Sequence, residues 1–202
     1  MKFNIHNSAI ENIKTELGIA ELGFLHFTPD TTNKLSAKFA NTDLNAYPEY
    51  IHKTIELRSN PLKLYPWTKS AIIAAIPFNQ IPDSPPFLQP AKNPELSGKI
   101  AGYAMKSDYH SFGKKILAKF AEKLKKEINC EIRTEISIDT APVAERALAV
   151  MAGIGRIGKN SCLLTTKNGS GCFIGEIFTD IQINLNEKTK HNKTHALNVE
   201  NA

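Results

Sequence analysis

The feature that most constrains the fold is a continuous apolar run from Ser70 to Phe78, S-A-I-I-A-A-I-P-F. A strand with one face in water alternates apolar and polar residues, whereas a strand covered on both faces is apolar throughout. The run therefore predicts a central strand in a sheet that has other elements packed on both of its faces. The rest of the chain must supply those covering elements.

Amphipathic segments that would cover such a sheet occur before and after the run. The longest is a predicted helix that Ser107 would cap and that ends at Ile128, with a face rich in lysine. Other helices are predicted over 7–17, 31–39 and 46–57, and other strands over 22–27 and 131–138. These elements predict an α/β (α+β) fold, a mixed sheet flanked by helices.

A single carboxylate, Asp139, stands at the end of the predicted strand 131–138. Thr140 is a candidate cap for a short helix after it, and Pro142 suits a first turn because its missing N–H costs nothing there. The alanine-rich stretch from Ala144 to Ala152 favours helix, and Gly153 is expected to end it.

A glycine loop follows that helix, with Gly153, Gly155 and Gly158, and it is closed by Lys159 and Asn160. The spacing matches a dinucleotide fingerprint and nearly matches a phosphate-binding P-loop. Both motifs present a helix N-terminus to phosphates directly after a strand. Here the glycines follow a helix and precede a strand, so both interpretations are set aside. We expect instead a loop whose backbone can approach a large flat group.

Two apolar runs, 162–166 and 172–178, flank Lys167 to Ser170 in the next stretch. The turn contains Asn168 followed by Gly169, and both residue types tolerate positive φ. The pattern predicts a β-hairpin in which the two runs pair with each other.

Composition limits the class of protein. The 202 residues, 42% of them hydrophobic, suffice for one domain with a sizeable core, and no apolar run approaches the length of a membrane span. Three cysteines without a C-x-x-C pair and without an export signal predict a cytoplasmic protein with reduced thiols. The net charge of +5 and the lysine-rich helix face are compatible with nucleic acid, although such a face is most often only solvated.

The motifs together resemble the amino-terminal half of the epoxyqueuosine reductases, cobalamin-dependent enzymes that complete queuosine in tRNA. The resemblance covers roughly residues 10 to 185. It is carried by Asp139-Thr-Ala-Pro-Val-x-Glu-Arg146, Ala152-Gly-x-Gly-x-x-Gly158-Lys159-Asn160, Gly175-Glu-Ile-x-Thr-Asp180, Arg58-x-x-Pro61 and Tyr103-Ala-x-x-x-Asp108-Tyr109-His110.

The resemblance implies a nitroreductase-like cobalamin-binding fold, a tRNA substrate, and these site residues. Cobalamin contacts are expected from Arg58, Gly102, Tyr103, Asp139, Arg146, Gly158, Lys159 and Asn160. Around Gly102 the sequence departs from the family pattern, which leaves its backbone as the expected contact. No metal ligands are expected from the protein.

The resemblance implies that Asp139 donates a proton to the epoxide oxygen as its bond to carbon breaks. A carboxylic acid can serve near neutral pH if burial against an apolar plate disfavours its charged form. The alternative is that Asp139 only helps to cap the following helix. His110 could serve the substrate or hydrogen-bond locally, and Glu176 and Asp180 are given no catalytic role.

Family members continue into a ferredoxin-like domain with two [4Fe–4S] clusters, whose cysteine runs do not occur in this sequence. The expected division is a cobalamin-binding catalytic domain over 1–185 and a polar, disordered tail over 186–202. An external electron donor, such as a ferredoxin or flavodoxin, would then be required. Four alternatives remain. The chain is a truncated product, a lone domain reduced by a partner, a non-catalytic or degenerate corrinoid-binding protein, or a flavin-dependent nitroreductase-like enzyme.

Overall fold

The computed structural model describes residues 1–40, 43, 45, 47–82 and 101–185 of the chain, with only the backbone of Gly102 and Met105. The predicted disordered tail over 186–202 lies outside the described residues. Within the described ranges, no helix is both long enough and apolar enough to cross a lipid bilayer.

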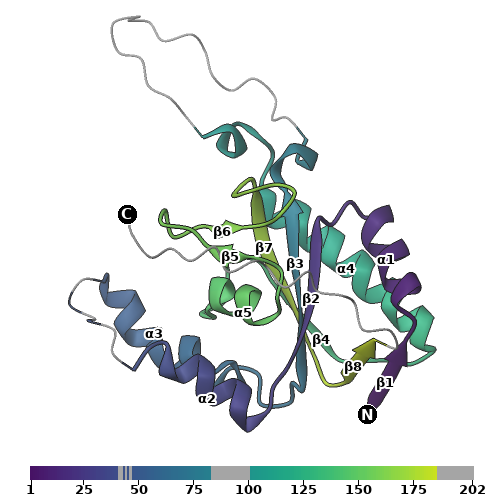
Figure 1. Ribbon diagram of the computed structural model, residues 1–202, viewed down its shortest axis with the longest axis horizontal. Coiled ribbons are helices and arrows are strands. Elements are labelled where there is room, and N and C mark those ends of the chain that lie inside the picture. The colour runs from purple at the N-terminus through teal and green to yellow at the C-terminus, as the bar shows by residue number, and fades with distance from the viewer. Residues whose placement is uncertain (41–42, 44, 46, 83–100, 186–202) are drawn as a thin grey trace, which may run out of the picture.

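The centre of the molecule is a four-stranded antiparallel sheet with the strand order β2-β3-β7-β4 (Figure 1). Its strands are β2 (Glu21–His26), β3 (Ser70–Pro77), β7 (Cys172–Thr179) and β4 (Thr134–Ser137). Every residue of β3 is buried, and β3 pairs with β2 on one side and β7 on the other. The central, doubly covered strand predicted from the apolar run is confirmed.

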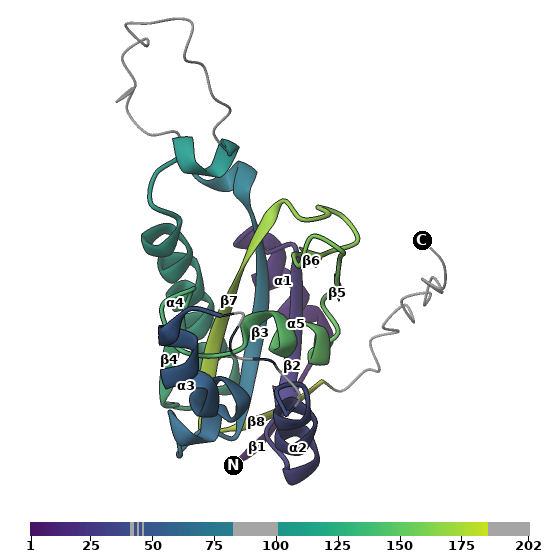
Figure 2. The ribbon, with the colours of Figure 1, turned by 90° about the vertical axis from the view of Figure 1, so that its left-hand side faces the viewer.

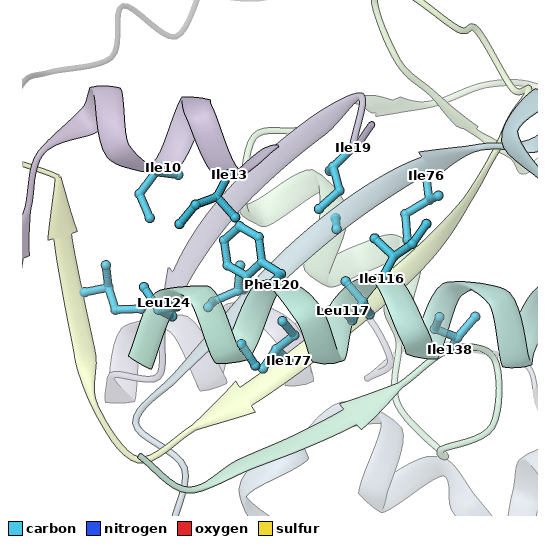
Figure 3. Packing of buried hydrophobic residues seen from close by; sticks show 14 of the residues in the cluster. Ile10, Ile13, Ile19, Ile76, Ile116, Leu117, Phe120, Leu124, Ile138 and Ile177 are labelled. Atoms are coloured by element: carbon cyan, nitrogen blue, oxygen red, sulfur yellow. The ribbon is translucent and has the colours of Figure 1, made fainter. Parts of the chain in front are cut away.

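One face of the sheet is covered by α1 (Asn7–Glu16) and α4 (Tyr109–Ile128). Figure 3 shows Ile10 and Ile13 of α1 pointing toward Phe120 of α4, with Ile177 of β7 beneath. Beside this layer, β1 (Lys2–Ile5) and β8 (Gln182–Leu185) pair in parallel. The predicted α/β (α+β) fold is confirmed, with parallel pairing confined to β1 and β8 among the described strands.

The other face carries α2 (Pro29–Ala37) and α5 (Glu145–Met151), and α3 (Glu49–Ser59) packs against α2. Figure 2 shows α5 lying over the sheet on this side. A small hairpin of β5 (Arg156–Ile157) and β6 (Leu163–Leu164) packs beside α5. Short 3-10 turns complete the described chain: η2 (Pro61–Lys63), η3 (Phe78–Gln80) and η4 (Gly102–Met105).

Two predicted helix caps are wrong. The helix α4 is capped by Asp108 rather than Ser107, because the Asp108 carboxylate accepts hydrogen bonds from the backbone N–H groups of His110 and Ser111. The helix α5 begins later than predicted, and its N-cap, Ala144, offers no side-chain bond. Thr140 therefore does not cap α5, since an irregular segment separates them.

The predicted end of α5 is confirmed. Gly153 has φ +78°, and its N–H bonds to the carbonyl of Val150 while the N–H of Ile154 bonds to that of Ala149. This pair of bonds is the Schellman arrangement, which favours glycine at the left-handed position.

The predicted hairpin between 162–166 and 172–178 is wrong. The strand β6 pairs with β5 instead, with Ile157 opposite Leu163. The segment after it folds back on itself through a bridge between Thr165 and Gly169, whose φ is +53°. The turn residues therefore reverse the chain locally, and β7 takes β3 and β4 as partners.

Candidate active site

A cleft of about 950 Å³ opens where the beginnings of α4, α5 and β7 meet the end of β4. The elements that form it come from distant parts of the sequence. Antiparallel pairing places the last residue of β4, Ser137, opposite Glu176 in the middle of β7, so the chain that leaves β4 runs toward the beginning of β7. Its lining is Phe78, Asn79, Ala101, Tyr103, Lys106, Tyr109, Asp139, Glu145, Arg146, Ser161, Cys162, Leu163, Ser170, Gly171, Cys172, Phe173 and Ile174.

Aromatic rings form one wall of this cleft. The ring of Phe78 lies 5.1 Å from that of Tyr103 and 6.1 Å from that of Phe173, and the ring of Tyr109 lies 5.5 Å from Phe173. Tyr103 is 42% exposed, although its ring also packs on its neighbours. The wall therefore offers an apolar surface to a flat molecule.

Asp139 occupies the rim of the cleft in a left-handed backbone conformation, with φ +50°. Aspartate is among the few residues that adopt this conformation readily, and it turns the chain out of β4 toward α5. Oδ2 of Asp139 accepts a hydrogen bond of 2.8 Å from the phenol of Tyr109, and 63% of the Asp139 side chain is exposed. Asp139 therefore does not cap α5, which contradicts the alternative in which capping is its purpose.

Tyr109 was not identified as a site residue by the sequence. Partial burial raises the pKa of the Tyr109 phenol, and the hydrogen bond to Asp139 raises it further. The phenol is thus kept as a donor toward the carboxylate. The signal for Tyr109 was its place at the beginning of a predicted helix, beside His110.

His110 lies between two carboxylates at the beginning of α4. Its Nδ1 is 2.9 Å from Oδ1 of Asp108, and its Nε2 is 4.0 Å from Oδ2 of Asp139. The imidazole also stacks on Tyr109 with the ring centres 3.9 Å apart. Hydrogen bonds from Ser111 and His110 hold the pKa of Asp108 well below its usual range, so Asp108 remains a charged anchor for this corner.

The two predicted arginine contacts lie in different environments. Arg146 is on α5, lines the cleft, and donates from Nη1 to the carbonyl of Ser161 at 2.7 Å. Arg58 does not line the cleft and instead donates from Nη1 to the carbonyl of Val143 at 3.3 Å. Arg58 therefore supports the segment that leads from Asp139 to α5.

The residues Gly158, Lys159 and Asn160 form the tip of the β5–β6 turn and are outside the lining of the cleft. A Cβ at Gly158 would lie 2.9 Å from the Leu164 side chain. The absent side chain thus serves the packing of the hairpin itself. The Asn160 side chain accepts a hydrogen bond from the N–H of Cys162, the next residue but one.

Of the other residues expected at the site, Tyr103 lies in the wall, and Gly102 precedes it in η4. Glu145, at the start of α5, also lines the cleft. No three His, Cys, Asp or Glu side chains in the described ranges are grouped so that they could hold a metal ion.

Comparison with known proteins shows which family the chain resembles. The family model described as epoxyqueuosine reductase QueG, DUF1730, matches residues 58–140, which contain both Arg58 and Asp139. The resemblance to the epoxyqueuosine reductases is confirmed. An epoxyqueuosine reductase of Cyclobacterium marinum is 36% identical over 166 residues, which are 82% of this chain and 50% of that protein.

Further epoxyqueuosine reductases show the same likeness. The protein of Vibrio cholerae is 34% identical over 135 residues, which are 67% of this chain and 36% of that protein. The solved structure from Streptococcus thermophilus superposes with a TM-score of 0.60 and 26% identity, covering 88% of this chain and 46% of that one. The chain thus spans about half or less of the length of the epoxyqueuosine reductases that it matches.

Proposed function

We propose that this chain is the cobalamin-binding catalytic domain of an epoxyqueuosine reductase, which reduces epoxyqueuosine to queuosine in tRNA. The observation that carries the proposal is the Tyr109–Asp139 hydrogen bond at the rim of an aromatic-walled cleft. The family match supports it, since the matched segment ends just after Asp139.

The lining of the cleft fits a corrinoid, which is broad, mostly apolar and fringed with amides. The rings of Tyr103, Phe78 and Phe173 supply apolar cover, while Arg146 and the hydroxyl of Ser161 supply donors beside it. Bound cobalamin would supply the two electrons that reduce the epoxide. A ferredoxin or flavodoxin is the kind of donor that would deliver those electrons.

The proposed role of Asp139 is to donate a proton to the epoxide oxygen as its bond to carbon breaks. The Asp139 side chain is largely exposed in the cleft, and a corrin ring lying on the aromatic wall would bury it. Burial disfavours the charged form of a carboxyl group and therefore favours the acid that the reaction needs. Tyr109 would hold the carboxyl group in place while the cleft is filled.

The tRNA substrate is also part of the proposal. One solved epoxyqueuosine reductase, with a TM-score of 0.54 and 24% identity, contains an epoxyqueuosine-modified stem loop of tRNA-Tyr. By this likeness we infer that the substrate of the present chain is also an epoxyqueuosine-modified tRNA stem loop.

The test is turnover of epoxyqueuosine-containing RNA by the cobalamin-loaded chain with a chemical reductant. We expect the wild-type chain to form queuosine, and Asp139→Asn to keep cobalamin binding but lose turnover. Single-cycle turnover retained in Asp139→Asn would remove Asp139 from the acid role. Binding without any turnover in the wild-type chain would favour the non-catalytic alternative.

A further inference from the structure

The positive charge of the chain is concentrated in the helix α4. This helix contains six lysines and two glutamates, a net charge of +4, whereas the whole chain carries +5. Its buried side packs on the sheet through Ile116, Leu117, Phe120 and Leu124. Figure 2 shows α4 at the outer edge of the molecule. The rest of the chain is therefore nearly neutral, and α4 is the element that attracts a polyanion.

Three of these lysines form a row on the exposed side of α4. Lys115, Lys119 and Lys126 are all exposed, and successive members are four and seven residues apart. Because an α-helix has about 3.6 residues per turn, these intervals bring the three side chains to the same side. A rise of about 1.5 Å per residue makes this lysine row roughly 16 Å long. Glu122 also lies on this side, between the second and third lysines.

The lysine row is not neutralised by the protein itself. On the flanks of α4, Lys123 pairs with Glu16 at 2.9 Å, and Lys125 pairs with Glu131 at 3.0 Å. The three lysines of the row, in contrast, make no ion pair and no hydrogen bond with the described residues. Their ammonium groups are therefore available to an anion from outside.

The stability of α4 does not account for the row. Like charges four residues apart destabilise a helix, and this spacing separates Lys115 from Lys119 and Lys119 from Lys123. The helix dipole favours lysine in the last turn, which accounts for Lys126 but not for the other two. Sequences break such local rules mainly at functional sites. The repeated charge therefore points to a binding role.

We propose that the lysine row of α4 binds the phosphate backbone of the RNA substrate. The proposal rests on the proposed function, because it takes a tRNA stem loop as the substrate. The helix begins at Tyr109, which lines the cleft, so the row leads away from the place where the reacting base enters. Ammonium groups bind phosphates whatever the base sequence. A long, narrow row also suits a strand of phosphates better than it suits a compact acidic patch on an electron-donor protein.

The first test measures RNA binding without cofactor or turnover. A synthetic anticodon stem loop of tRNA-Tyr without epoxyqueuosine is titrated with the whole chain by fluorescence anisotropy at several salt concentrations. We expect the triple variant Lys115→Gln/Lys119→Gln/Lys126→Gln to bind more weakly. The slope of log K against log salt should shrink by about 2–3, since each lost phosphate contact removes about 0.7–0.9. An unchanged slope, or no RNA binding by wild type, would overturn the proposal.

A matched control removes the same charge elsewhere. Lys34, Lys53 and Lys63 lie on α2, α3 and η2, and each is paired with a carboxylate. Their triple glutamine variant should keep the wild-type slope, and an equal loss would show that net charge alone attracts the RNA, contrary to the proposal. Glu122→Gln removes the carboxylate from the row and should tighten binding, an effect that misfolding cannot produce. Weaker or unchanged binding in Glu122→Gln would count against the row.

The second test locates the RNA on the wild-type chain. Reductive methylation of lysine amines, followed by mass spectrometry, is compared with and without a saturating amount of the stem loop. We expect RNA to protect the lysine row and to leave Lys34 and Lys53 reactive. Equal labelling of the row in both samples would refute the proposal, and so would protection by flavodoxin but not by RNA. A chain that binds RNA through the row but forms no queuosine would contradict the proposed function and support this surface.

Discussion

The phenol of Tyr109 donates a hydrogen bond of 2.8 Å to Oδ2 of Asp139, although the two residues are 30 positions apart in the sequence. Tyr109 is the first residue of α4, and Asp139 follows β4, so the bond joins the two ends of an α–β unit. The candidate acid is thereby fixed to the helix whose first turn also carries His110.

Replacing Tyr109 with phenylalanine tests this relationship. The ring contacts with Phe173 and Tyr103 remain, so we expect the melting temperature to change little. Asp139 loses the donor that orients it, and we expect kcat to fall about tenfold with KM unchanged, because misplacing a reacting group costs rate. Steady-state kinetics with the chemically reduced, cobalamin-loaded chain provides the measurement. Wild-type kcat in Tyr109→Phe would mean that the bond has no role in turnover.

The N-cap of α4 gives a prediction with a matched control. Asp108→Ala removes the carboxylate that accepts from His110 and Ser111, and we expect the melting temperature to fall by about 2–4 °C. The neighbouring Ser107→Ala leaves the cap intact, so its melting temperature should match wild type. Equal melting temperatures in the two variants, measured by circular dichroism, would contradict the assignment of Asp108 as the cap.

The same cap has a defined pH dependence. Its hydrogen bonds hold the folded-state pKa of Asp108 below the usual value of 3.8. The stabilisation is therefore present above pH 3.8 and is lost as the pH falls through the lower, folded-state pKa. The difference in melting temperature between wild type and Asp108→Ala should narrow in that acid range.

The buried Glu176 predicts the opposite pH dependence. Below its usual pKa of 4.5 the carboxyl group is protonated in both the folded and the unfolded chain. Above that value only the unfolded chain releases the proton, so stability falls by about 1.4 kcal/mol per pH unit until the raised folded-state pKa is passed. Urea unfolding of wild type and Glu176→Gln between pH 4.5 and 8 should show curves that diverge. Parallel curves would mean that Glu176 is ionised in the folded chain.

Two substitutions distinguish the roles of Arg146 and Arg58, the two arginines expected to contact the cofactor. Arg146→Ala removes a donor from the cleft, and we expect cobalamin affinity to fall about tenfold, which corresponds to about 1.4 kcal/mol. Arg58→Ala removes the bond to the Val143 carbonyl, so we expect a loss of stability of about 1–2 kcal/mol. Cobalamin titration and thermal melting of both variants provide the comparison. Loss of affinity in Arg58→Ala at unchanged stability would restore Arg58 as a direct contact.

Parts of the fold that depend on local pattern could be predicted from the sequence. The apolar run at Ser70–Pro77 became the central strand because full burial leaves a continuous apolar signature. The helical spacing in α1 and α4 also identified the helices correctly, with errors of one or a few residues at their caps. These features depend on whether one face or both faces of a helix or strand are buried, and the spacing of apolar residues in the sequence indicates this directly.

What could not be predicted depends on which distant segments meet. The turn at Asn168 and Gly169 suggested that β6 would pair with β7, yet β3 and β4 occupy both edges of β7. The contact of Tyr109 with Asp139 likewise follows from α4 packing beside β4 and has no local signature. Glu176 did carry a signal, a lone charge within an apolar strand, but only the register beside Ser137 shows its setting.

The most direct test of the central claim is the absorption spectrum of cob(II)alamin mixed with the purified, folded chain. The cleft walled by Tyr103, Phe78 and Phe173 is predicted to bind the corrinoid and shift its spectrum to the base-off form, in proportion to the chain added. A spectrum that stays that of free cob(II)alamin at excess protein would contradict the account.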